Sequence, residues 1–305
     1  MPNLITITGA TGHVGGGIAE RLLDRGHKVR AIARSEERLK PLAEKGAEIW
    51  AGDLADTEFL TKAFEGADAV FAMIPPNPAA EDLRADYRKF ADSIARSLQA
   101  AGTLNVVALS SVGGSLPSGT GPIAGLHDFE ERLKQVAGLS LTVLRPTYFM
   151  ENLLYMIPLI KSAGINGGAI KGDVPVAMIA TADIAEAAAG ILAGPGSSGT
   201  EVRELLGPKD LTFSEASGIL GAAIGKPDLQ YVEFSAQDYR GALLGMGFSP
   251  SVADSYLEMD AAISNGIIQK TTTRDAQSTT KITLDEFARD VFAPAFKGAA
   301  SEAKA

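Results

Sequence analysis

The fold is decided by the stretch Thr8-Gly9-Ala10-Thr11-Gly12-His13-Val14-Gly15, which directly follows the apolar, β-branched residues 4–7. Its three glycines stand three positions apart, between a strand-like run and a helical pattern. The first glycine permits a tight turn, the second leaves the turn without a side chain, and the third lets the helix pack on the strand. We therefore predict a strand, a glycine-rich turn and a helix that open a parallel sheet.

The helix after this turn is predicted to be amphipathic and to end at Gly26. Its apolar stripe consists of Val14, Ile18, Leu22 and Leu23. The first N–H groups of a helix and its positive dipole end hold anions, so the turn suits a pyrophosphate. The alternative is a turn that packs helix on sheet without a ligand. The residues expected to hold the phosphates are Gly9, Thr11, Gly12, His13, Val14 and Gly15.

The composition excludes several classes of function. The chain has 305 residues, 46% of them apolar, and a net charge of −9, which argues against a nucleic-acid partner because such a partner needs a basic face. It has no cysteine, so disulfides, thiolate catalysis and cysteine-ligated metals are excluded. The three histidines, His13, His27 and His127, show no ligand spacing, and we expect no metal site.

Membrane and export signals are also not expected. The most apolar stretch, residues 149–160, is interrupted by Glu151, Asn152 and Pro158 and is too short to cross a bilayer. The first predicted strand begins almost at Met1, which leaves no room for a signal peptide before it. We therefore expect a cytoplasmic protein.

Strand and helix patterns alternate through the first half of the chain, which predicts a doubly wound α/β fold with a parallel sheet. The predicted strands are residues 3–8, 28–33, 47–51, 68–74, 104–109 and 140–145, and the longest helix covers about 81–101. Residues 1–150 are expected to form the dinucleotide-binding domain, with 175–195 returning to it. Residues 151–305 are expected to form mainly a smaller α+β lobe, with residues 199–265 in it and a strand near 174–179.

The end of the second predicted strand carries a positive charge where dinucleotide folds read the adenosine ribose. An acidic residue there repels a 2′-phosphate, but this chain has Arg34 and Ser35, and Arg38 follows one turn later. A guanidinium fork suits a phosphate. We predict that these three residues bind the 2′-phosphate of NADP(H); a solvated surface arginine is the alternative.

The third strand ends in Gly52-Asp53-Leu54. Asp53 could accept a hydrogen bond from the adenine amine, with Leu54 against the ring. The alternative role for Asp53 is a helix cap or a turn residue.

Together these motifs resemble the NmrA-like family, an atypical branch of the short-chain dehydrogenase/reductase superfamily. The resemblance covers nearly the whole chain and implies a Rossmann domain, a small C-terminal lobe and a preference for NADP(H). It places Met73, Ile74 and Pro75, with Ala72, beside the cofactor's ribose and nicotinamide, and Pro146 and Tyr148 on the other side of the nicotinamide. The remaining motifs that carry it are Leu109-Ser110-Ser111, residues 144–152 and residues 179–185.

One departure from the superfamily affects the chemistry. Ordinary members carry a Tyr-x-x-x-Lys pair on the helix after the fifth strand, but alignment by spacing puts His127 and Glu131 there, as in quinone-reducing members of the family. One helical turn apart, these side chains can meet, and a carboxylate beside an imidazole would suit proton donation. Ser110 stands where the superfamily has a hydroxyl that bonds the substrate oxygen. A surface pair without a role and a turn-forming serine are the alternatives.

Two functions fit this pattern. The first is an NADPH-dependent reductase that transfers a hydride to a quinone or a similar conjugated carbonyl, a small-molecule acceptor that needs little acid catalysis. The second is a non-catalytic NADP(H)-binding redox sensor that regulates a protein partner. Nucleotide-sugar epimerisation ranks last, because it depends on the missing tyrosine–lysine pair. The oligomeric state stays open. The apolar residues expected to line the acceptor pocket, unless they are plain core, are Met73, Ile74, Tyr148, Phe149, Leu153 and Met156.

Overall fold

The computed structural model describes residues 4–196 and 198–298. Its central sheet has seven strands: β1 (Leu4–Thr8), β2 (Lys28–Ala33), β3 (Glu48–Ala51), β4 (Ala69–Ala72), β5 (Asn105–Leu109), β6 (Ser140–Pro146) and β10 (Thr200–Leu205). All are parallel to their neighbours, in the order β10-β6-β5-β4-β1-β2-β3. The order reverses between β1 and β4, and this is where open α/β sheets bind their ligands.

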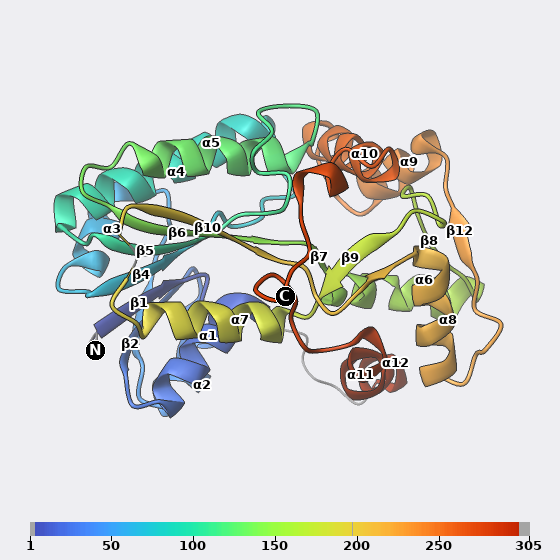
Figure 1. Ribbon diagram of the computed structural model, residues 1–305, viewed down its shortest axis with the longest axis horizontal. Coiled ribbons are helices and arrows are strands. Elements are labelled where there is room, and N and C mark those ends of the chain that lie inside the picture. Colours follow the sequence, from blue (N-terminus) through green and yellow to red (C-terminus); the bar gives the residue numbers. More distant parts are fainter. Residues whose placement is uncertain (1–3, 197, 299–305) are drawn as a thin grey trace.

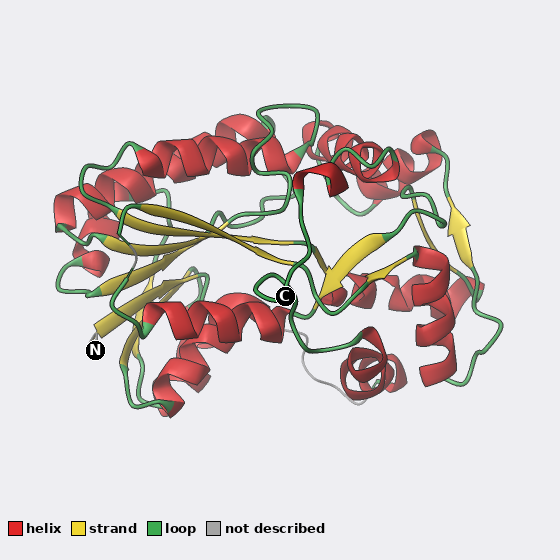
Figure 2. Ribbon diagram, in the orientation of Figure 1, coloured by secondary structure: helices red, strands yellow, loops and turns green. Residues whose placement is uncertain are grey.

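Helices cover both faces of this sheet, as Figures 1 and 2 show. On one face lie α1 (His13–Asp24), α2 (Glu36–Glu44) and α7 (Thr181–Leu192), and on the other α3 (Thr57–Phe64), α4 (Leu83–Ala101) and α5 (Pro122–Lys134). Successive strand residues point to opposite faces. Ile5 and Ile7 of β1 therefore join the core under α1, while Val70 and Ala72 of β4 join the core under α4.

The predicted doubly wound parallel fold is confirmed, and each of the six predicted strands is present within two residues of its expected ends. The seventh strand, β10, was missed. We expected residues from about 199 onward in the smaller lobe, but β10 pairs with β6 and extends the central sheet. The reason is its sequence, Thr-Glu-Val-Arg-Glu-Leu, because an exposed edge strand lacks the apolar run that marks the inner strands.

The remaining elements form what we call the small-sheet region. It contains two short sheets, β11-β9-β7 and β12-β8, and a core that includes Met150, Phe213 and Phe292. The predicted division into domains stays a prediction. The strands are β7 (Tyr148–Phe149), β8 (Asn166–Gly168), β9 (Val176–Ile179), β11 (Asp210–Leu211) and β12 (Tyr231–Glu233), and the helices are α6 (Ile157–Ala163), α8 (Phe213–Ala223), α9 (Ala236–Gly245), α10 (Pro250–Ser264), α11 (Leu284–Phe287) and α12 (Ala293–Lys297), with 3₁₀ turns at Met150–Met156 and Gln269–Thr271 and a π-helical turn at Ala288–Phe292.

A side chain from the small-sheet region caps a helix of the central sheet. Ala180, the residue before α7, offers no side-chain cap. Glu151 instead accepts hydrogen bonds from the backbone N–H of Thr181, at 3.0 Å, and from its hydroxyl, at 2.6 Å. A carboxylate at a helix N-terminus also complements the helix dipole. Within residues 4–196 and 198–298, each helix is too short or too polar to span a lipid bilayer.

Candidate functional site

The glycine turn after β1 has the geometry that its sequence predicts. Gly9 has a φ of +63°, in the left-handed region that favours glycine. A Cβ atom at Gly15 would stand 2.4 Å from the carbonyl oxygen of Gly9, so only glycine allows α1 to lie this close to the turn. Gly12 precedes α1 with extended backbone and no side-chain cap. The first-turn N–H groups of α1 are therefore bordered by bare backbone, as an anion site needs.

The predicted phosphate-reading residues meet at the end of β2, beside this turn. The N–H of Ala10 donates to the carbonyl of Ile32 at 3.0 Å, which holds the turn against β2. Arg38 donates to the carbonyl of Thr11 at 3.3 Å, and the hydroxyl of Ser35 accepts from the N–H of Arg38 at 3.3 Å, capping α2. Arg34 is exposed and has no hydrogen bond or ion pair with the residues that the structure describes. Its guanidinium is thus available to an external anion.

At the end of β3, the structure supports the alternative role for Asp53. Its carboxylate accepts a hydrogen bond from the N–H of Ala55 at 2.9 Å, which is a turn contact. Leu54 is only 6% exposed and packs in the core under α4. Contact of these two residues with an adenine stays a prediction.

The segment after β4 lies against the glycine turn. The sulfur of Met73 would be 2.8 Å from a Cβ atom placed on Gly9, and the Met73 N–H donates to the Thr8 hydroxyl at 3.1 Å. Ile74 is buried and Pro75 is half-buried. Met73 therefore lies over the turn, as expected for a residue beside a bound dinucleotide.

Helix α5 arranges its two predicted catalytic residues differently from our expectation. Nδ1 of His127 lies 2.9 Å from the carbonyl oxygen of Gly114, and since a carbonyl only accepts, Nδ1 carries the proton. Glu131 pairs with Lys134 at 2.7 Å, and this contact lowers the pKa of the carboxyl. His127 and Glu131 form no hydrogen bond with each other in the described part of the chain, and their catalytic role stays a prediction. His127 bonds to the backbone of Gly114 and Glu131 pairs with Lys134, and helical spacing alone could not reveal either contact.

A buried ionic cluster that sequence reasoning missed lies next to them. Glu130 is fully buried and accepts from Arg145 at 2.6 and 2.9 Å and from the Ser110 hydroxyl at 2.5 Å. The proton of Ser110 therefore points to Glu130 rather than to an acceptor molecule. The only signals in the sequence were a glutamate on the apolar side of a helix and an arginine in a buried strand. This cluster ties α5 to β5 and β6.

The apolar residues predicted to surround the acceptor divide between core and partly exposed positions. Leu153 and Ile74 are 1% and 7% exposed and belong to two separate cores. Tyr148, half-buried, packs edge-on against Phe213 at a ring distance of 5.2 Å. Burial raises the pKa of the Tyr148 hydroxyl, which keeps its proton. The other predicted pocket residues, Met73, Phe149 and Met156, are half-buried, and Pro146 is buried at the end of β6.

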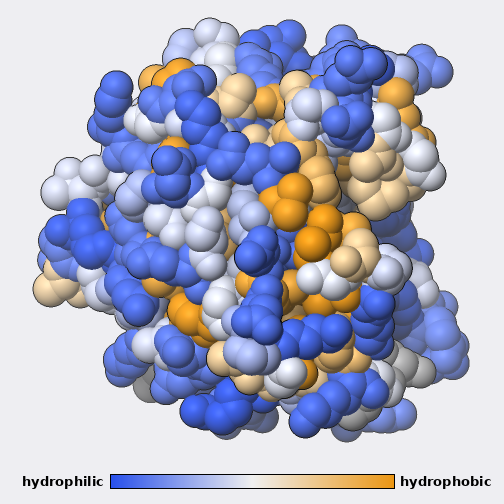
Figure 3. All heavy atoms as spheres, turned by 90° about the vertical axis from the view of Figure 1, so that its right-hand side faces the viewer, coloured by the Kyte–Doolittle hydropathy of each residue, from blue (hydrophilic) through white to orange (hydrophobic). Residues whose placement is uncertain are grey.

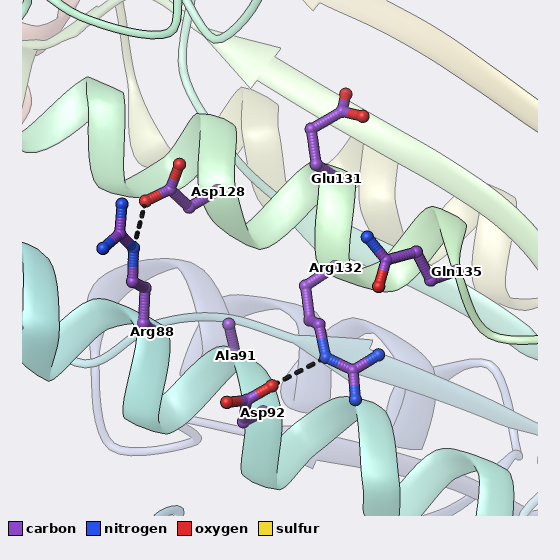
Figure 4. Close-up of a pocket in the computed structure, with 7 residues that line it drawn as sticks. All are labelled: Arg88, Ala91, Asp92, Asp128, Glu131, Arg132 and Gln135. Carbon is purple, nitrogen blue, oxygen red and sulfur yellow. Dashed lines mark hydrogen bonds and ion pairs between the residues drawn. The ribbon is translucent and has the colours of Figure 1, made fainter.

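A shallow groove of about 260 Å³ lies between α4 and α5 on the outer face of the molecule (Figure 4). Its charges are paired internally, because Arg88 contacts Asp128 at 2.7 Å and Arg132 contacts Asp92 at 2.7 Å. Glu131 lies at the rim of this groove. The groove therefore offers no strong unpaired charge to a ligand. The lining residues are Arg88, Ala91, Asp92, Asp128, Glu131, Arg132 and Gln135.

In the described residues, no cluster of three or more histidine or carboxylate side chains could hold a metal ion. The residues present do fit a phosphorylated dinucleotide: a turn kept bare by three glycines, an uncapped helix end and an unpaired guanidinium at the end of β2.

Comparison with known proteins agrees with this geometry. The model of the NmrA-like family matches residues 1–288. The chain is 34% identical over 255 residues to (4-alkanoyl-5-oxo-2,5-dihydrofuran-3-yl)methyl phosphate reductase of Streptomyces griseus subsp. griseus, covering 84% of this chain and 85% of the relative. A structure of an NADPH-dependent quinone oxidoreductase from Escherichia coli, complexed with NADPH, is similar with a TM-score of 0.78 and 26% identity, covering 94% of this chain and 99% of that chain.

A structure of the negative transcriptional regulator NmrA in complex with NADP is also similar. It has a TM-score of 0.71 and 17% identity, and the match covers 97% of each chain. At this identity the likeness concerns the fold alone.

Proposed function

The chain belongs to the NmrA-like family, and from this membership we propose that it is an NADP(H)-dependent oxidoreductase that reduces a quinone or a similar conjugated carbonyl compound. The observation that carries the proposal is the exposed Arg34 beside the glycine turn, where a 2′-phosphate would lie; it has no hydrogen bond or ion pair with residues 4–196 and 198–298. The similar proteins add support, since one is a reductase acting on an oxo-dihydrofuran and another is a quinone oxidoreductase bound to NADPH.

The chain's own residues would hold NADP(H) in two places. The glycine turn and the first N–H groups of α1 would bind the pyrophosphate, and Arg34, with Ser35 and Arg38, would bind the 2′-phosphate. Met73 and Tyr148 would border the nicotinamide, which supplies a hydride when the cofactor is bound.

The acceptor class follows from what α5 lacks. The helix contains no tyrosine, so reduction of an ordinary ketone would forgo about 10²–10⁴-fold of acid catalysis. A quinone needs less help, because a gained hydride leaves the anion of an aromatic hydroquinone, a weakly basic phenolate. Two predicted residues could still contact an acceptor. His127 bonds to Gly114 through Nδ1, which leaves its Nε2 available, and Tyr148 keeps its hydroxyl proton.

The test measures NADPH oxidation by absorbance with 2-methyl-1,4-naphthoquinone, an alkylated butenolide and cyclohexanone as acceptors. We expect turnover with the first two and at least about 100-fold slower turnover with the ketone. NADH should support the reaction poorly.

The contrary outcome is tight NADPH binding without turnover of any acceptor. The protein would then be an NADP(H)-binding sensor, the alternative that the absent tyrosine–lysine pair also allows. Calorimetry with NADPH on the same preparation separates this outcome from an inactive sample.

A further inference from the structure

Asp260, on α10, is a buried carboxyl group that the proposed function does not yet use. It is 5% exposed and forms no hydrogen bond or ion pair with residues 4–196 or 198–298. A carboxyl group buried without a partner is costly when charged, so its environment selects the protonated form. Burial raises its pKa to about 7.

Four tyrosines, on β7, β12, α9 and α10 itself, lie within electrostatic reach of this carboxyl. Burial raises the pKa of Tyr148 on β7, Tyr231 on β12, Tyr239 on α9 and Tyr256 on α10, and the negative charge of Asp260 adds to the effect at each of them. All four are only partly buried, as expected for side chains that border a binding space rather than a closed core. Figure 3, which views the right-hand side of Figure 1, shows apolar side chains gathered near the middle of that face, within a hydrophilic surround.

The rings of this group are held by other aromatic residues. Tyr148 and Tyr231 both pack on Phe213, at ring distances of 5.2 and 5.3 Å, and Tyr256 packs on Phe248 at 5.8 Å. The Tyr231 hydroxyl donates to the carbonyl of Ile170 at 2.8 Å. These contacts hold the rings of Tyr148, Tyr231 and Tyr256 in place near the Asp260 carboxyl.

The charged groups on the elements packed against α10 are engaged elsewhere. Arg240 of α9 pairs with Asp254 at 2.5 Å, and Arg84 of α4 pairs with Asp128 of α5 at 2.8 Å. The ring of His127 on α5 bonds to the carbonyl of Gly114. Further titratable groups that act electrostatically in this region are Asp86 on Tyr87 of α4, Glu258 of α10 on Arg84, and Tyr155 on Tyr256.

We propose that Asp260, Tyr148, Tyr231, Tyr239 and Tyr256 form the acceptor subsite, and that the Asp260 carboxyl donates a hydrogen bond, and then its proton, to an oxygen of a neutral conjugated carbonyl acceptor. The inference rests on the proposed function, because Tyr148 connects the subsite to the predicted nicotinamide side.

Proton transfer from Asp260 to the acceptor oxygen conserves atoms and electrons. An acceptor that has gained a hydride, supplied by NADPH, carries two more electrons and a negative charge on oxygen. The O–H bond of the Asp260 carboxyl breaks and a new O–H bond forms on the acceptor. The carboxylate left behind is neutralised again by a proton from water. Asp260 thereby protonates the reduced quinone, an anion that needs less acid catalysis than the alkoxide of a ketone.

The first experiment measures binding without turnover. The dissociation constant of 2-methyl-1,4-naphthoquinone is determined on the protein saturated with NADP⁺, from pH 5.5 to 8.5, by calorimetry. We expect binding to weaken about three- to tenfold as the pH rises through 7, because one hydrogen bond is lost when Asp260 ionises. A pH-independent constant, or tighter binding at high pH, would overturn the proposal.

Variants locate the effect. Asp260→Asn keeps the shape but cannot titrate, so its quinone affinity should not change with pH, and its kcat with the quinone should fall about three- to tenfold, the worth of one hydrogen bond, with NADPH affinity intact. Asp254→Asn, on the same helix but exposed, should behave as the wild type. A pH dependence that persists in Asp260→Asn would contradict the assignment. If this variant does not fold, Tyr239→Phe on α9 should weaken quinone binding while keeping its pH dependence.

The two proposals fail separately. Quinone binding that follows Asp260 without NADPH oxidation would remove the reductase and keep the subsite. Turnover with pH-independent quinone binding would remove the subsite and keep the reductase.

Discussion

Two charged side chains, Arg34 and Glu130, have opposite environments and therefore different roles. Arg34 is exposed and unpaired among the described residues, so its charge is available for a ligand. Glu130 is fully buried and paired with Arg145, so its charge serves the structure. The first could be recognised from its position after a strand. The second could not, because its role depends on partners 15 and 20 positions away.

Arg34→Ala should lower NADPH affinity about 10–150-fold, because one charge-assisted hydrogen bond of about 1.5–3 kcal/mol is lost. NADH affinity should hardly change, since NADH lacks the 2′-phosphate. Calorimetry with both cofactors checks this. Arg96→Ala, which removes another exposed arginine on α4, serves as the control. Equal losses for NADH and NADPH would contradict the 2′-phosphate assignment.

Glu130→Gln should destabilise the protein by about 3–5 kcal/mol, because it leaves Arg145, whose side chain is only 12% exposed, without its counter-charge. The neighbouring change Glu131→Gln is a matched control. It affects a half-exposed pair with Lys134 and should cost less than about 1 kcal/mol. Urea denaturation of both variants makes the comparison. Similar midpoints for the two would show that the buried cluster adds no stability.

Among the elements, α1 depends on a close approach that only glycine permits. Gly15→Ala would place a Cβ atom 2.4 Å from the Gly9 carbonyl oxygen, so the turn must shift. We expect a loss of about 1–3 kcal/mol in stability and weaker NADPH binding. Gly190→Ala, in α7, meets no atom within 4 Å and should stabilise by about 0.5–1 kcal/mol. Thermal unfolding and NADPH titration test both, and an unaffected Gly15→Ala would contradict the geometry.

The ends of the elements show where sequence patterns stop being informative. α7 was predicted from its own residues, but its N-terminus is capped by Glu151 from the small-sheet region. β10 was missed because an exposed edge strand has little apolar periodicity. The five inner strands were found because strands buried on both faces form continuous apolar runs.

The stability of the entire protein should respond to pH through Asp260. The folded-state pKa of this carboxyl is about 7, above its ordinary value, so the unfolded chain releases the proton first as the pH rises. Stability should therefore fall between about pH 4 and 7, by up to about 4 kcal/mol, and then level off.

The measurement is urea denaturation of the wild type and Asp260→Asn from pH 5 to 8. The wild type should lose stability relative to the variant as the pH rises. Parallel profiles would mean that Asp260 is ionised in the folded protein without a penalty.

The sequence alone determined the parallel sheet, the glycine turn, the family and the preference for NADP(H). These depend on short-range features: strand periodicity, glycines at fixed spacing, and a charge directly after a strand. Only the tertiary structure decided which acids and bases have partners. Only the folded chain shows that His127 bonds to Gly114, that Glu130 rather than Glu131 is buried, and that Asp260 of α10 is buried without a hydrogen bond or ion pair to the described residues. Burial and pairing depend on residues far apart in the chain, and those determine which side chain keeps, loses or donates a proton.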